Sequence, residues 1–119
     1  MSMNYCLINI TKKEQILFSH LPASTRWELT TYPVSAALTT WYLINNSGDQ
    51  IGFIPDTYGP GDKEWPFKNI SREQTYQFPD VTDKIVNEMV AEGILKDCGV
   101  DIFDKNEPNV FIRKLEVIR

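Results

Sequence analysis

The sequence is poor in the residues on which small metal sites and disulfide frameworks depend. It contains two cysteines, Cys6 and Cys98, and one histidine, His20. A single histidine excludes histidine-rich zinc sites and two-histidine acid–base sites within one chain. The two cysteines form no CxxC motif, and a disulfide would need a fold that brings their Cα atoms within about 7 Å. We therefore expect free, reduced cysteines, no metal site and no cofactor.

Positive charge and long apolar runs are also scarce. Twelve Lys and Arg residues oppose sixteen Asp and Glu residues, which gives a net charge of −4. This balance argues against a general nucleic-acid binder, because contacts with phosphates need a basic surface. No apolar run approaches the roughly 18–20 residues of a membrane span. The first residues also lack the charged and apolar regions of a signal peptide, so we expect a soluble cytoplasmic protein.

What is present is an ordinary globular composition, with 42% apolar and 24% charged residues in a chain of 119. That length corresponds to one domain, residues 1–119, with enough core to fold without disulfides or metal. The pattern predicts an α+β fold: a single-layer antiparallel or mixed sheet with about three helices packed on one face. The expected strands cover 5–10, 16–21, 50–54, 101–104 and 110–118, and the expected helices cover 25–31, 33–44 and 80–92.

Capping residues mark the helix boundaries. Thr25 and Glu28 fit a capping box, and Pro33 suits the first turn of a second helix. Asp80 is placed to cap the third helix, and Gly93 is placed to end it. The expected core faces of the last two helices consist of Val34, Ala37, Leu38, Trp41 and Ile44, and of Val81, Ile85, Met89 and Val90.

The segment 55–69 is a long loop without a strand or helix pattern, and such connections are often functional. It combines acidic and aromatic side chains, which is the composition of a protein-binding hot spot. In the alternative interpretation, Trp65 and Phe67 simply cover the core. A calcium site of the EF-hand type is excluded, because Tyr58, Pro60 and Phe67 stand where its ligands would be. The predicted partner-binding residues are Asp56, Tyr58, Asp62, Glu64 and Trp65, flanked by Glu88 and Glu92.

Acidic residues concentrate in the middle and later part of the chain. Residues 49–107 contain thirteen acidic and six basic side chains, a net charge of −7. A surface of that sign attracts a basic partner and speeds their encounter. The simpler interpretation is that the acidic residues keep the protein soluble.

Small size, acidity, an acidic and aromatic loop and an α+β pattern together resemble the bacterial immunity proteins that neutralise secreted or contact-delivered toxins. The resemblance implies a non-enzymatic protein that binds a cognate toxin in a heterocomplex. The toxin would be a nuclease, basic because it binds nucleic acid, and the immunity protein would block its active site or an adjoining surface. Direct contact with nucleic acid or a membrane is not expected. If Trp65 anchors this partner, Trp65→Ala should cost about 2 kcal/mol or more of binding energy.

Two other functions fit the same sequence. The first is a structural or self-associating domain, a homodimer in which the C-terminal strand pairs with a copy of itself. The second is a small enzyme or ligand-binding domain that uses Cys6, His20 or the acidic loop. However, the sequence contains no P-loop, GxGxxG, HExxH or GxSxG motif. In a strand, moreover, Ser19 would point away from His20, which we expect to be half-buried there.

Overall fold

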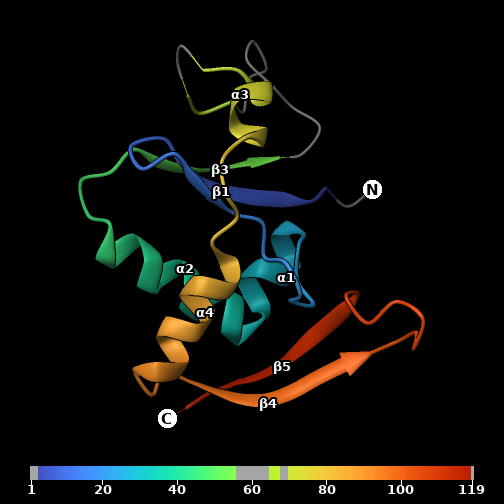
Figure 1. The fold of residues 1–119 in the computed structure, drawn as a ribbon. Coiled ribbons are helices and arrows are strands. Elements are labelled where there is room, and N and C mark those ends of the chain that lie inside the picture. Colours follow the sequence, from blue (N-terminus) through green and yellow to red (C-terminus); the bar gives the residue numbers. More distant parts are fainter. Residues whose placement is uncertain (1–2, 56–64, 68–69, 119) are drawn as a thin grey trace.

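The computed structural model describes residues 3–55, 65–67 and 70–118. Within this part of the chain the α+β class is confirmed, and Figure 1 shows helices between two separate sheets. The elements in chain order are β1 (Tyr5–Asn9), β2 (Glu14–Ile16), α1 (Arg26–Thr31), α2 (Pro33–Asn45), β3 (Ile51–Pro55), α3 (Arg72–Tyr76), α4 (Thr82–Ala91), β4 (Leu95–Ile102) and β5 (Phe111–Val117).

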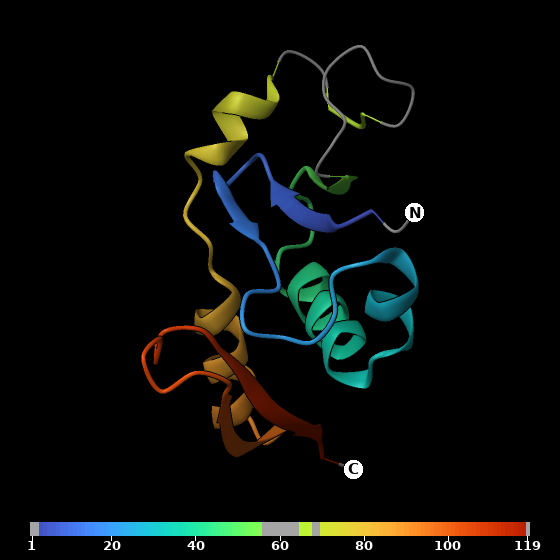
Figure 2. The ribbon, with the colours of Figure 1, turned by 90° about the vertical axis from the view of Figure 1, so that its right-hand side faces the viewer.

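The strands are divided between two antiparallel sheets instead of sharing the single layer that the sequence predicted. The first sheet has the order β2–β1–β3, and Leu7 of β1 lies opposite Ile16 on one side and Phe53 on the other. The second sheet is the hairpin β4–β5. Helices α1, α2 and α4 lie between the two sheets in both views, and α3 lies beyond the first sheet (Figure 1, Figure 2).

The second predicted strand, 16–21, is wrong beyond Ile16. The chain turns away from the sheet because Phe18 and His20 have positive φ angles of 56° and 66°. Phe18 nevertheless enters the core and is only 2% exposed. The apolar pattern therefore reflects burial in a turn, and His20 lies in this turn instead of a strand.

The capping predictions for α1 and α2 are confirmed. Thr25 Oγ1 accepts a hydrogen bond from the Glu28 backbone N–H at 3.3 Å, and the Glu28 carboxylate accepts one from the Thr25 N–H at 3.2 Å. Pro33 is the first residue of α2. Ile44, predicted in the core, is 68% exposed, because the helix turns Tyr42 toward the first sheet. The buried residues of α2 are Val34, Ser35, Leu38 and Tyr42.

The end of α4 follows the prediction, but its start differs from it. The helix begins at Thr82 with Val81 at its N-cap, so Asp80 lies one residue before the predicted capping position. Asp80 Oδ1 instead accepts a hydrogen bond from the backbone N–H of Thr82, the first helical residue, at 3.0 Å. Gly93 follows the helix with a φ of 78°, a conformation that glycine adopts without steric cost. Val86, absent from the predicted apolar face, is fully buried.

The hairpin β4–β5 covers the helices on the side away from the first sheet. β4 begins at Leu95 and is longer than the predicted strand at 101–104. An irregularity between Asp97 and Val100 interrupts its pairing with β5. Of all β4 residues Leu95 alone is buried, which fits a strand of a surface hairpin and not the centre of a shared sheet.

Two hydrophobic clusters hold the described residues together. The larger lies among the first sheet, the helices and the base of the hairpin, and the smaller covers the other face of β1 and β3. The smaller cluster consists of Cys6, Ile8, Ile54 and Phe67, with Ile10, Trp65, Ile70 and Phe78 packed against it.

None of the helices in residues 3–55, 65–67 and 70–118 is long and apolar enough to cross a bilayer.

Candidate protein-binding groove

A shallow apolar groove of about 390 Å³ lies between α2 and the C-terminal end of α4. Its floor includes Met89, which is fully buried, and its wall includes Ile44, which is mostly exposed. The side chains of Ala36 and Ala37 are small, so they leave space beside the larger groups. We call this feature the α2–α4 groove; it is lined by Ala36, Ala37, Thr40, Trp41, Ile44, Met89 and Ile94.

Trp41 is fixed in the wall of the groove by a polar contact. Its indole Nε1 donates a hydrogen bond to Glu88 Oε1 at 3.1 Å, a link from α2 to α4. The ring is half-buried, so it keeps an apolar surface for contact and needs no large rearrangement to offer it. An aromatic side chain that is held in place beside a charged group is typical of the residues that anchor a protein interface.

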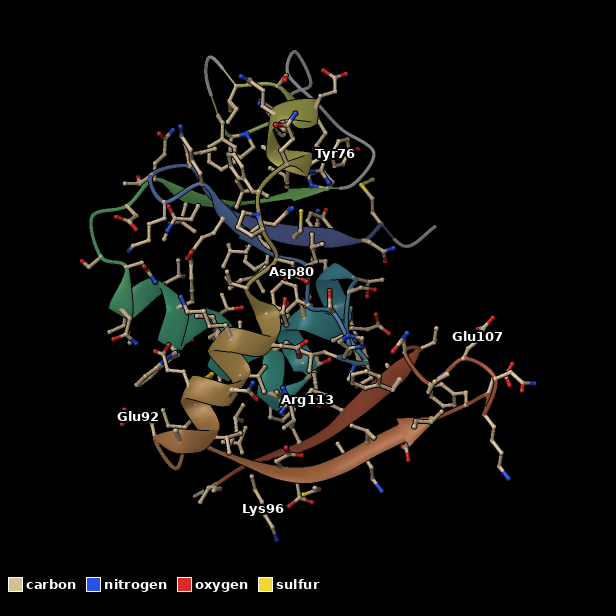
Figure 3. The ribbon with its side chains drawn as sticks, viewed as in Figure 1. Tyr76, Asp80, Glu92, Lys96, Glu107 and Arg113 are labelled. Atoms are coloured by element: carbon tan, nitrogen blue, oxygen red, sulfur yellow. The ribbon has the colours of Figure 1, made fainter. Side chains whose placement is uncertain are left out.

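Two acidic residues, Glu88 and Glu92, lie at the C-terminal end of α4, and Glu88 contacts Trp41 in the wall of the groove. They lie four residues apart, so they face the same side of the helix, and both are exposed. Figure 3 places Glu92 at the far end of α4. Negative charge at a helix C-terminus opposes the helix dipole, and the last turn of α4 contains no basic residue. Helix stability therefore does not account for these two acids.

A polar pocket of about 180 Å³ adjoins the groove, shares Trp41 with it and is lined in part by Glu88. Behind it, buried Asn9 donates to the Tyr42 hydroxyl at 3.0 Å, and that hydroxyl donates to the Glu14 carboxylate. Burial first, and then the bond to Glu14, raises the pKa of Tyr42 above its ordinary value. Tyr42 therefore stays neutral and serves to tie α2 to the first sheet.

The predicted binding residues fall in three places. Asp56, Tyr58, Asp62 and Glu64 lie outside the described residues. Trp65 packs half-buried on the smaller cluster, where its ring meets Phe67 edge-on at 6.1 Å between centroids. Trp65→Ala would therefore disturb packing as well as any contact with a partner. Glu88 contacts Trp41 in the wall of the groove, and Glu92 follows the last turn of α4.

The residues considered for catalysis are each held by other groups. The Cys6 thiol is 4% exposed and lies 3.9 Å from the Ile54 carbonyl oxygen. The His20 ring stacks on Phe111 with 3.9 Å between centroids, and its Nδ1 lies 3.1 Å from the Phe111 carbonyl oxygen. Both cysteines are free, as expected. Among the described residues, no three or more His, Cys, Asp or Glu side chains are grouped as metal ligands would be.

The sequence reasoning missed the groove because it placed Trp41 and Ile44 on one core face of α2. The one signal against that assignment was the position of Ile44 directly before the polar run 45–48.

Comparison with models of known protein families, with curated proteins and with solved structures finds no match to this chain.

Proposed function

We propose that the chain is a non-enzymatic protein-binding module, an immunity protein that binds and neutralises a cognate toxin with a basic nuclease domain. The observation that carries the proposal is the α2–α4 groove, an apolar centre with Trp41 in its wall and the acidic Glu88 bound to Trp41. Interfaces combine an apolar centre and a polar rim in this way. The groove is shallow, which suits a protein surface better than a small substrate.

The charge of the chain supports a basic partner. Residues 49–107 have a net charge of −7, and Glu88 and Glu92 belong to them. Glu88 holds Trp41 by a hydrogen bond, whereas Glu92 stands where its charge weakens the helix, so a contribution to binding explains the position of Glu92 better than a contribution to folding. Asp56, Tyr58, Asp62, Glu64 and Trp65 are proposed as a further contact in the same complex.

The proposal is tested with the double variant Glu88→Gln/Glu92→Gln. Glutamine keeps an oxygen that can accept from Trp41 Nε1, so the wall of the groove is retained while both charges are removed. The ligand is the protein that co-purifies with the chain when the products of the neighbouring genes are co-expressed, and the dissociation constant is measured by calorimetry at low and high salt. We expect binding about tenfold weaker at low salt, with a smaller loss at high salt because salt screens exposed charges.

Two controls make the result specific. Glu116→Gln removes an exposed acid from β5 and should leave the dissociation constant unchanged. The melting temperature of the double variant should stay equal or rise, because an unfavourable charge at the helix end is gone. Equal affinity of the double variant and the unmodified protein at both salt concentrations would refute the groove as the contact.

A further inference from the structure

The far end of the β4–β5 hairpin exposes large apolar side chains that the rest of the described chain does not cover. Phe103 is 73% exposed and Val110 is 58% exposed, and Val100 and Ile102 are each about half exposed. Figure 1 shows this end of the hairpin projecting beyond the helices, and Figure 3 places Glu107 at its outermost turn. We call Val100, Ile102, Phe103 and Val110 the hairpin tip. Clustered exposed apolar groups are characteristic of interaction sites.

The base of the hairpin is held firmly, so the tip is presented in a fixed position. The Arg113 guanidinium donates to Asp83 at 3.3 Å and to Asn87 at 3.0 Å on α4, and to Asp97 on β4 at 3.3 Å. Figure 3 shows Arg113 between the hairpin and α4. The Arg113 backbone N–H also donates to the His20 carbonyl at 2.7 Å. A surface fixed before binding loses less conformational entropy when a partner docks.

The outer edge of β4 is a poor place for strand addition. The pairing irregularity between Asp97 and Val100 includes Gly99, whose φ is 103°. Such bulges twist an edge and interrupt its row of hydrogen-bonding groups. The side chains of the hairpin tip, and not its backbone edge, are therefore the groups available to a partner.

The charges around the hairpin tip decide between two kinds of partner. Residues 100–110 contain three exposed acids, Asp101, Asp104 and Glu107, and one base, Lys105. Lys114 of β5 lies 3.9 Å from Asp101 and offsets its charge, so the negative excess at the tip comes from Asp104 and Glu107. A second copy of the chain would bring like charges together at the tip, whereas a basic partner would be attracted to it. We propose that the hairpin tip docks a basic amphipathic segment of the toxin, as a second contact in the complex; this inference rests on the proposed function.

The test uses the full chain and two short peptides, one alternating Lys and Leu and the other alternating Glu and Leu. Amide chemical shifts are followed by nuclear magnetic resonance during each titration. We expect saturable shifts in residues 100–110 with the Lys–Leu peptide and none there with the Glu–Leu peptide. Phe103→Ser/Val110→Ser should weaken Lys–Leu binding by about tenfold or more. Because both side chains are largely exposed, the double variant should remain folded.

Trp27→Ser is the matched control, since Trp27 is an exposed apolar residue on α1 at 75%. It should leave the peptide affinity unchanged. Equal binding of both peptides, or an equal loss in Trp27→Ser, would overturn the inference. So would a dimer of the unmodified chain that Phe103→Ser/Val110→Ser abolishes, since a second copy would then cover the tip. The titration does not involve Glu88 or Glu92, so its result is separate from that of the calorimetric test.

Discussion

Asp80 shows how one side chain can join three segments of this fold. Its Oδ2 accepts from the Ser19 hydroxyl at 2.5 Å, and its Oδ1 accepts from the backbone N–H of Leu17 at 3.2 Å and of Thr82 at 3.0 Å. Burial alone would raise the pKa of Asp80. The hydrogen bonds from Ser19, Thr82 and Leu17 outweigh it and hold the pKa below its ordinary value of 3.8.

The low pKa of Asp80 predicts a stability effect that depends on pH. A carboxylate with a lowered pKa stabilises the folded state above its ordinary pKa of 3.8, and this contribution is lost as the pH falls through the folded pKa. Asp80→Asn should therefore cost about 1 kcal/mol of unfolding free energy near neutral pH, and less below pH 3.8. Urea unfolding of both proteins across this pH range measures it. A cost that stays constant down to about pH 2 would contradict this account.

At the scale of elements, the hairpin depends on Arg113 for its attachment to α4. The side chain of Arg113 is 11% exposed and lies between Asp83 and Asp97, which are each about half exposed. The Gly99 backbone N–H, and then Arg113, keep the pKa of Asp97 below its ordinary value. Without the guanidinium, two carboxylates would face each other across the junction of α4 and β4.

Arg113→Met keeps an apolar stem of similar length but removes these hydrogen bonds. We expect a loss of about 1–2 kcal/mol of unfolding free energy, because the contacts are partly exposed. Hydrogen exchange should become faster in β4 and β5 than in the first sheet. Lys114→Met is the control on the same strand, since Lys114 is 52% exposed and lies 3.9 Å from Asp101. Equal effects of the two substitutions would show that Arg113 does not attach the hairpin.

Local sequence signals predicted the helix boundaries well where the interacting groups lie close together in the sequence. The capping box at Thr25 and Glu28 and the left-handed Gly93 are examples, since each depends on residues close in sequence. The turn at Phe18 and His20 could not be predicted in this way. Phe18 is buried there by contacts with distant parts of the chain, and Thr82 accepts its backbone N–H at 3.1 Å.

The candidate site shows the same limit. The acids Glu88 and Glu92 were identified from charge, but the groove beside them forms only when α2 packs against α4. Periodicity could not separate the buried Tyr42 from the exposed Ile44, because that choice depends on where the first sheet lies. The exposed hairpin tip was not predicted either, because the sequence pattern of a strand does not show which end of a hairpin packs against the helices.

At the scale of the whole molecule, the acidic character and the apolar surfaces point to the same kind of partner. The chain has a net charge of −4, and both the α2–α4 groove and the hairpin tip combine apolar groups with nearby acids. A basic protein would be attracted by the charge and held by the apolar contacts. This combination predicts a heterocomplex whose affinity depends on salt.

Binding of a basic partner is best tested by co-expression of the tagged chain with the products of the genes beside its own, followed by native mass spectrometry of the purified material. We expect a stoichiometric complex with a basic protein that dissociates as the ionic strength is raised. Recovery of the chain as a monomer or homodimer alone, with every neighbouring product expressed and soluble, would contradict it.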